Sequence, residues 1–288
     1  MKKPVWANLI VLLVGINSIN TFVANTEDDN SEIERTFSIM SYNVRLFNAY
    51  NWIKKESIKE DIFNLFKERS SDILCLQEFY APKELPQLDY PFQHIGLQQK
   101  KSQWHMAIYS QFPQINKGTV SIKGERMNNT CIFSDMIIDK DTIRVYNIHL
   151  ASNWFDKKEL DFIKNPDLNK QVIKEGLLSI GKRLKESFQK RAIEVDVIKK
   201  NLDSSPFPVL VCGDFNDIPN SYSYQKITKG LEDSFLKKGN GIGSTFIGKI
   251  PFLRIDYIFH SQEFATTNFS VHPKKLSDHK AIESIIGF

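Results

Sequence analysis

The sequence predicts an α/β fold in which two β-sheets pack together and helices cover their outer faces. Three observations predict it: a strand–helix–strand pattern near the start, hairpin-like pairs of apolar strands early and late, and a long charged helical stretch between them. The chain has 288 residues, no linker rich in Pro, Gly or Ser, and no internal repeat, which favours one large domain.

The first elements form the strand–helix–strand unit. Strand, helix and strand are predicted at residues 36–44, 54–70 and 72–79. The helix is amphipathic because Ile58, Ile62 and Phe66 recur at helical spacing.

The rest of the chain supplies more strands and one helical region. Further strands are predicted at residues 104–110, 131–138, 142–150, 209–211, 255–261, 267–271 and 281–286. Asp139, Lys140 and Asp141 have the composition of a hairpin turn. From Trp154 to about Asn201 the pattern is charged and helical, and it fits one long helix or two shorter ones.

The N-terminus has the pattern of an export signal. Lys2 and Lys3 precede the apolar run 9–16, which is typical of a secretory signal peptide or a single membrane anchor. The run is short for a spanning helix, and the bulky Phe22 two positions before Ala24 makes a poor cleavage site. A hydrophobic helix packed on the domain is the alternative. We expect an exported protein, whether periplasmic, secreted or membrane-anchored, and cleavage of the segment stays open. The expected organisation is a signal peptide or anchor over residues 1–26 and the folded domain over residues 36–288.

Composition narrows the class of substrate only slightly. The net charge of +4 and pI of about 8.7 fit an anionic substrate, but are far below those of a dedicated nucleic-acid arm. Cys75, Cys131 and Cys212 lie in apolar, strand-like runs, so we expect buried thiols, although a disulfide between two of them stays open.

Polar side chains close several of these apolar strands. In the stretch VLVCGDFND, Gly213 permits a turn or a close backbone approach, and Asp214 and Asn216 are two residues apart, so both leave an extended chain on the same side. Carboxylates at the edge of a core need a cation, a donor or water to offset their desolvation. The set comprises the amides Asn43 and Asn216, the carboxylates Glu78, Asp214, Asp256 and Asp278, and the imidazoles His149 and His279.

Such an oxygen-rich set has the chemistry of a hard divalent cation, Mg²⁺ or Mn²⁺. A cation of this kind neutralises phosphate charge, and an imidazole beside a carboxylate can act as a general base or hold a phosphoryl oxygen. The residues therefore predict metal-assisted hydrolysis of a phosphate ester.

Six segments then carry a resemblance. SYNVRLFN, LCLQEF, NIHL, CGDFND, RIDYIF and SDHKAI, in this order, resemble the endonuclease/exonuclease/phosphatase superfamily, whose members are deoxyribonuclease I-like. The resemblance runs from about Ser38 to Ile285. It implies a four-layered αββα sandwich, in which two mixed β-sheets are packed together and flanked by helices.

The resemblance also implies a metal site. Asn43 and Glu78 would lie at the divalent ion with Glu78 as its principal ligand, and Asp278 would assist there. Arg191 would approach the site from its helix and bind substrate, although a solvated helix charge is the plainer interpretation of an arginine in such a pattern.

Other residues would act on the phosphate. By the resemblance, Asp214 orients or deprotonates the attacking water or protonates the leaving oxygen, and Asn216 holds a phosphate oxygen and the water. His279 contacts the scissile phosphate while Asp256 holds its imidazole, and His149 binds a phosphate oxygen. The plainer alternatives are an Asx turn at Asp214 and Asn216, a surface ion pair at Asp256, and a merely hydrogen-bonded His149.

The expected activity is divalent-metal-dependent phosphodiester hydrolysis by an endonuclease acting on nucleic acid. The alternative is a phospholipid, phosphoinositide or sphingomyelin-type phosphoesterase of the same fold, for which the N-terminal segment would provide membrane contact. A catalytically dead binding module is the third hypothesis, but Glu78, Asp214 and His279 are all present. Trp104 and Trp154 are candidates for substrate stacking or for core or lid packing. The oligomeric state stays open.

Overall fold

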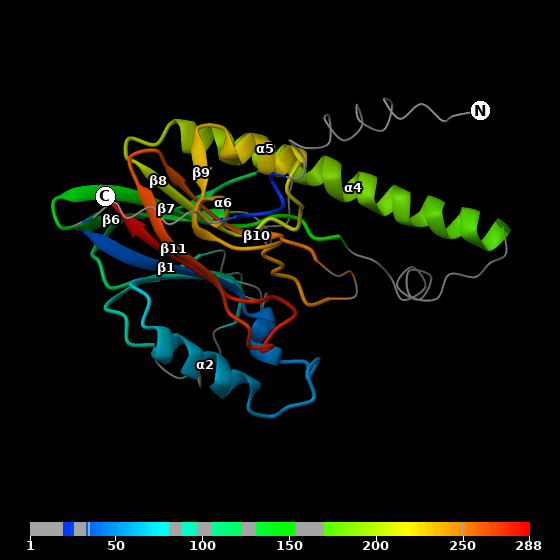
Figure 1. The fold of residues 1–288 in the computed structure, drawn as a ribbon, viewed down its shortest axis with the longest axis horizontal. Coiled ribbons are helices and arrows are strands. Elements are labelled where there is room, and N and C mark those ends of the chain that lie inside the picture. Colours follow the sequence, from blue (N-terminus) through cyan, green and yellow to red (C-terminus); the bar gives the residue numbers. More distant parts are fainter. Residues whose placement is uncertain are drawn as a thin grey trace.

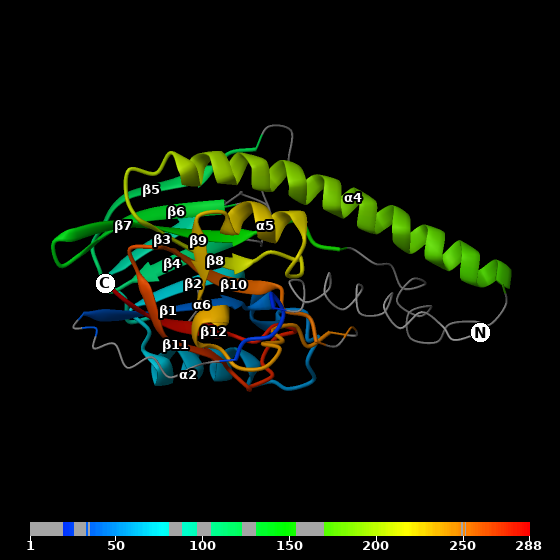
Figure 2. The same cartoon turned by 45° about the horizontal axis from the view of Figure 1, so that its top comes forward.

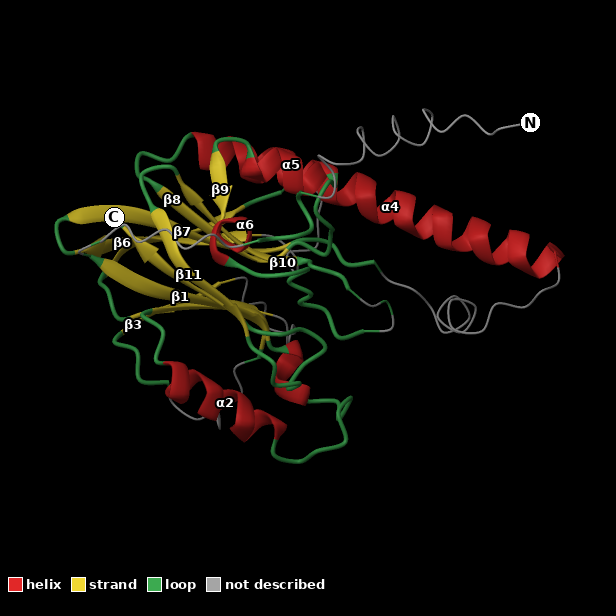
Figure 3. Cartoon of the chain, in the orientation of Figure 1, coloured by secondary structure: helices red, strands yellow, loops and turns green. Residues whose placement is uncertain are grey.

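The computed structural model describes residues 20–25, 33, 35–80, 88–96, 105–122, 131–153, 170–248, 250 and 252–288. Two six-stranded sheets form the centre of the molecule, with α2 on one side and α4 and α5 on the other (Figure 1). Colouring by secondary structure shows the same order of layers, with both sheets between helices (Figure 3). The predicted αββα sandwich is confirmed.

The first sheet contains the predicted strand–helix–strand unit. Its strands, in spatial order, are β11 (Ala265–Val271), β12 (Ile282–Gly287), β1 (Thr36–Asn43), β2 (Ile73–Phe79), β4 (His105–Ser110) and β3 (Phe92–Gly96). Strands β1 and β2 are parallel, because helix α2 (Ile58–Arg69) returns the chain to the same edge. The remaining pairings in this sheet are antiparallel.

The second sheet repeats this arrangement around β7 and β8. Its strands, in spatial order, are β5 (Gln114–Val120), β6 (Cys131–Ile138), β7 (Asp141–His149), β8 (Val209–Asp214), β10 (Asp256–Ser261) and β9 (Leu231–Asp233). Strands β7 and β8 are parallel and are connected through α4 (Lys170–Asp203), a single long helix that projects beyond the sheets (Figure 2). The short helices are η1 (Arg45–Asn48), α5 (Tyr222–Thr228) and α6 (Ser234–Lys238).

Three apolar clusters fill the interfaces between the layers. Side chains such as Ile39 and Cys212 fill the space between the sheets. Phe63 and Phe66 of α2 pack on the outer face of the first sheet, and Val195 of α4 packs on that of the second. The predicted buried thiols are confirmed, since Cys75, Cys131 and Cys212 are all free and buried.

Three strands were not predicted, and each lacks a periodic apolar pattern. Strands β3 and β5 are edge strands with much exposed or half-buried polar surface, and β9 has only three residues. An edge strand needs only one partner, so its sequence is less constrained than that of a central strand. Trp104 and Trp154 lie outside the described residues, as does the apolar run of the N-terminus.

The described part of the N-terminus is a short strap, residues 20–25, that packs on the domain. Ala24 is 4% exposed, and it exchanges two backbone hydrogen bonds with Gly241, each of 3.0 Å. Arg254 donates through Nη2 to the carbonyl of Thr21 at 2.8 Å. Within the described residues, the helices include none with the length and apolarity required to cross a membrane.

Candidate active site

The strand topology gathers the predicted polar residues at one edge of the sandwich. His149 and Asp214 are register partners in the parallel β7–β8 pair, and Asp256 faces Asp214 because β10 begins where the antiparallel β8 ends. In the other sheet, Asn43 and Glu78 lie at the ends of the parallel strands β1 and β2. Asn43 joins the two sheets by donating through Nδ2 to Asp214 Oδ2 at 2.9 Å and to Glu78 Oε1 at 3.3 Å.

Gly213 has a steric role at this edge. Its φ of 140° is unfavourable for other residues, and a Cβ added there would lie 1.9 Å from the carbonyl oxygen of Ile148. The glycine therefore allows β7 and β8 to lie close together directly before Asp214. Beyond it, the backbone N–H of Asn216 donates to Asp214 Oδ1 at 2.9 Å, so the Asx turn is present. The turn occupies one carboxylate oxygen and leaves Oδ2 facing Asn43.

Glu78 occupies an irregularity of β2. The pairing of β2 with β4 shifts register between Leu76 and Phe79, and Glu78 has a φ of 47°. The bulge places its carboxylate at the edge, where the side chain is 17% exposed. Burial and the negative charge of Asp278 raise the pKa of Glu78 to about 7, against the opposing effects of His279 and Asn43. The fold thus leaves this carboxylate without a full counter-charge.

His279 and Asp256 form a buried pair beside Asp214. His279 Nδ1 lies 3.0 Å from both oxygens of Asp256, and its Nε2 lies 3.5 Å from Asp214 Oδ2. The ring of Phe246 packs edge-on against the imidazole, with centroids 5.3 Å apart. Burial opposes protonation, but the charges of Asp256 and Asp214 raise the pKa of His279 well above its ordinary value. The arrangement favours an imidazolium oriented through Nδ1.

His149 lies on the other side of Asp214. Its Nε2 is 3.7 Å from Asp214 Oδ2 and 3.8 Å from Glu78 Oε1, and this atom is buried with no hydrogen-bond partner among the described residues. Burial lowers the pKa of His149, although the charge of Asp214 opposes this effect. A neutral imidazole with one orphaned nitrogen is suited to contact with a ligand group.

Arg191 is not a solvated helix charge. Its side chain is fully buried, its Nε lies 3.1 Å from Asp217 Oδ2, and its Nη1 donates to the carbonyl of Ala151 at 2.8 Å and to Asn153 Oδ1 at 3.0 Å. Asn153 in turn approaches the carbonyl of Asn216. A direct substrate contact would require this buried network to open, so the described geometry gives Arg191 a supporting position behind the site.

The donor set fits a divalent metal ion. Glu78 has a raised pKa and Asp278 as its negative neighbour, and its carboxylate lies beside the amide of Asn43. Asp214, Asp256 and His279 also have ligand atoms within 4.8 Å of one another. That trio is better explained as a hydrogen-bonded group, because Asp256 already accepts from His279 Nδ1.

Some residues of this edge were not singled out from the sequence. Arg45 pairs with Asp278, with 3.2 Å between Nη1 and Oδ2, and its backbone N–H donates to Asn43 Oδ1 at 3.0 Å. Asp217 is the buried partner of Arg191. Both residues lie inside segments that resemble the family, SYNVRLFN and CGDFND. Their place in these segments could have marked them as residues near the site.

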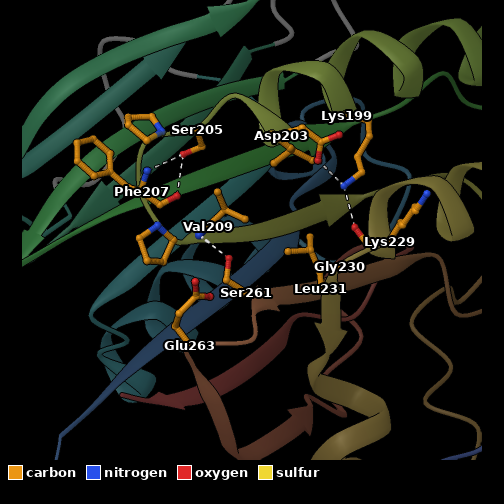
Figure 4. A pocket seen from close by; sticks show the side chains of 13 residues that line it. Lys199, Asp203, Ser205, Phe207, Val209, Lys229, Gly230, Leu231, Ser261 and Glu263 are labelled. Atoms are coloured by element: carbon orange, nitrogen blue, oxygen red, sulfur yellow. Dashed lines mark hydrogen bonds and ion pairs between the residues drawn. The ribbon is translucent and has the colours of Figure 1, made fainter.

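A separate pocket lies at the opposite end of β8. It has a volume of about 370 Å³ and is lined by residues that include Lys199, Phe207, Val209 and Glu263 (Figure 4). Lys199 Nζ is already bound to Asp203 and to the carbonyl of Lys229. The pocket shares no residue with the edge described above.

The fold and this edge define a class of metal-dependent phosphoester hydrolases, and comparison with known proteins gives the family. The model of the Endonuclease/Exonuclease/phosphatase family matches residues 40–279, and the chain belongs to that family. Its members are phosphoesterases that depend on divalent metal ions. A comparison with curated protein sequences gives no match.

Several solved structures share the fold at low sequence identity. A conserved protein from Enterococcus faecalis, described as functionally unknown, has a TM-score of 0.62 and 18% identity over 87% of this chain and 100% of its own. TDP2 from D. rerio, complexed with a single strand DNA product, has a TM-score of 0.61 and 13% identity over 88% of this chain and 100% of its own. A mannosyl-6-phosphatase from Bacteroides thetaiotaomicron has a TM-score of 0.61 and 18% identity over 88% of this chain and 100% of its own.

Proposed function

We propose that the protein is a Mg²⁺- or Mn²⁺-dependent phosphodiesterase that acts as an endonuclease on nucleic acid. The observation that carries the proposal is the meeting of the Asp256–His279 pair, Asp214 and the undercompensated Glu78 at one edge. The single strand DNA product in D. rerio TDP2 supports a nucleic-acid substrate within this fold. The mannosyl-6-phosphatase shows that the same fold also accommodates a different phosphate ester.

Glu78 would be the principal metal ligand, with Asn43 and Asp278 beside it. When bound, a divalent ion neutralises phosphate charge and lowers the pKa of a coordinated water. Placing a cation here would also relieve the repulsion between Glu78 and Asp278, which His279, Asn43 and Arg45 offset only in part. Mg²⁺ and Mn²⁺ are favoured because the ligands are oxygen atoms.

The residues of the second sheet would act on the phosphate and the water. Asp214 is held by the N–H of Asn216 and the amide of Asn43, so its carboxylate can orient a water and accept its proton. His279, held by Asp256, would donate from Nε2 to a phosphoryl oxygen as charge develops there. His149 and Asn216 would hold further phosphate oxygens, and Arg191 would act by positioning the segment that carries Asn216.

A phospholipid or sphingomyelin-type substrate is the second candidate. It is favoured by α4, which exposes Leu177, Leu178 and Phe188 at 59%, 63% and 49%. Apolar side chains on a projecting helix suit contact with a lipid surface. The two candidates use the same catalytic edge and differ in what binds around it.

We also propose that the protein is exported. The support is the charged start and short apolar run of the sequence. Residues 20–25 pack on the domain, and Ala24 is buried, which supports retention of this strap after any processing. Mass spectrometry of the protein purified from its natural cells would test retention of the strap. A mature chain starting after Asn25 would contradict that retention, although it would agree with export.

The test of the activity is a plasmid-nicking assay with the full chain. Supercoiled plasmid is incubated with protein and Mg²⁺ or Mn²⁺, with a chelator in parallel, and the His279→Ala protein serves as the site control. Nicking that requires both the metal and His279 supports the proposal. A folded, metal-binding protein that leaves plasmid and single strands intact but hydrolyses phospholipid would overturn it in favour of the second candidate.

A further inference from the structure

The segment that follows Asn43 presents two aromatic rings beside the candidate active site. The Trp52 ring lies 4.4 Å from the guanidinium carbon of Arg45, and Tyr50 packs against Trp52 with ring centroids 5.0 Å apart at 62°. Arg45 itself pairs with Asp278 at 3.2 Å. The rings are therefore within one side-chain length of the proposed metal-binding edge.

Both rings are substantially open to solvent. Tyr50 is 58% exposed and Trp52 is 39% exposed. Burial of a large aromatic ring is energetically favourable, so a solvent-exposed ring is often a ligand contact. A pair of exposed rings beside a candidate site indicates such a contact more strongly than a single exposed ring does. Stacking against a ligand would bury this surface.

The backbone that presents these rings is strained and firmly anchored. Arg45–Asn48 has consecutive positive φ values of 44°, 52°, 52° and 61°, a left-handed conformation that Cβ-bearing residues rarely adopt. Leu46 and Phe47 are buried, and Phe47 stacks on Phe63 with centroids 5.3 Å apart. Such strain persists where the surroundings fix it, and it clusters at ligand sites.

Asn48 closes the loop that carries the rings. Its side chain donates to the carbonyl of Ile53 and accepts from the backbone N–H of Ile53, each at 2.9 Å. The two bonds join the ends of the 48–53 segment, so Tyr50 and Trp52 stand on a short closed loop. A rigid platform loses little conformational entropy when a ligand stacks on it.

We propose that Tyr50, Trp52 and Arg45 form a stacking subsite for a nucleobase adjacent to the scissile phosphate. This inference rests on the proposed nuclease function and specifies how the strand is held. A nucleobase stacks on Trp and Tyr whatever its identity, because every base has a flat π-face. Arg45 already places a cation over Trp52, which disfavours a cationic lipid headgroup on this ring.

The test compares a single strand carrying normal bases with the same strand carrying abasic residues. Binding is measured by fluorescence anisotropy with Mg²⁺ in the His279→Ala background, in which we expect the strand to stay intact. We expect the base-containing strand to bind more tightly, and Trp52→Ala and Tyr50→Ala to reduce that preference by roughly 5- to 100-fold. Trp52→Phe should keep most of it, because a stacking ring remains.

Tyr222→Ala is the matched control. Tyr222 is 50% exposed and has its own cation, Lys226, 5.7 Å from its ring, but it lies on α5. Equal binding of both strands by the unsubstituted platform, or equal weakening by Trp52→Ala and Tyr222→Ala, would overturn the subsite. In a parallel measurement of binding to phospholipid vesicles, weakening by Trp52→Ala with no change in strand binding would overturn it as well. Cleavage by the native chain is scored separately, so its failure counts against the nuclease function and leaves the binding result interpretable.

Discussion

Glu78 and Glu283 belong to the same sheet, and burial acts to raise the pKa of both, but the net shifts of their pKa values are opposite. Burial acts to raise the pKa of Glu283 on β12, but His272, Ser71 and Arg69 lower it to about 2. Its side chain is 5% exposed and is paired with Arg69. Burial raises the pKa of Glu78 to about 7, and neighbouring Asp278 adds to the effect. One charge is neutralised inside the fold, and the other is left for a group that arrives from outside.

The difference separates a structural carboxylate from a functional one. A buried charge with a full set of donors contributes to stability, whereas one lacking them destabilises the protein until a cation binds. Burial alone would not distinguish the two positions. The charged and hydrogen-bonding partners of each carboxylate decide the direction of its pKa shift, and substitutions can test each position separately.

The largest expected effect is on activity, from Glu78→Gln. Metal-dependent hydrolysis should fall by roughly 10³-fold, because the principal metal ligand loses its charge. In chelator the melting temperature should stay the same or rise, since an uncompensated buried charge is removed. Thermal unfolding with and without Mg²⁺ measures the change in melting temperature. A melting temperature that falls in chelator would mean that Glu78 is structural like Glu283.

Asp256→Asn tests a carboxylate that is paired within the site. The substitution should lower kcat by roughly 10²-fold, with a smaller effect on KM, because His279 loses the anion that orients it and keeps it charged. The pH profile of kcat should shift to lower pH as the imidazolium becomes easier to deprotonate. An unchanged profile would show that Asp256 acts only in packing.

Glu283→Gln should have the reverse pattern to Glu78→Gln. The substitution leaves the Arg69 side of the network without its anion, so the free energy of unfolding should fall by about 2–3 kcal/mol. Hydrolysis should remain within about twofold of the native rate, because Glu283 and its partners His272, Ser71 and Arg69 share no residue with the candidate active site. Urea denaturation in chelator measures the first quantity, and a stability loss under 0.5 kcal/mol, roughly that of an average surface substitution, would contradict it.

The pH dependence of stability should also report the contribution of Glu283. Because its folded pKa is below its unfolded value of 4.5, Glu283 stabilises the fold above about pH 4.5, and this is lost as pH falls towards about 2. The shift corresponds to a contribution of at most about 3 kcal/mol, which solvent screening of the 44% exposed Arg69 reduces. The stability difference between native and Glu283→Gln proteins should shrink over this window, and a constant difference would assign it to packing.

The smallest expected effect tests a buried position that has no charge of its own. Ala24→Asp should lower the free energy of unfolding by about 1–2 kcal/mol, because the strap would bury an unpaired carboxylate. Val23→Asp is the matched control, since Val23 is 43% exposed one residue earlier. Equal effects of the two substitutions on thermal unfolding would show that the strap does not pack in solution.

Central strands were predicted from the sequence more readily than edge strands. Strand β8 is buried at every position and is apolar from Val209 to Cys212, which predicts a strand directly. Strand β5 has the sequence QINKGTV and is mostly exposed or half-buried, so no apolar pattern marked it. A central strand that is buried on both faces needs apolar residues along its length, whereas a largely exposed edge strand does not.

The sequence by itself determined the layers, the strand–helix–strand unit and which polar residues end the central strands. It did so because burial periodicity and strand-end chemistry are local, and because six segments resemble one family in order. Only the tertiary structure decided their partners. It joined Asn43 to Asp214 across the two sheets, placed Arg191 in a buried network, and set Trp52 beside Arg45. Distances between residues far apart in the chain depend on how sheets and loops pack, which no single segment encodes.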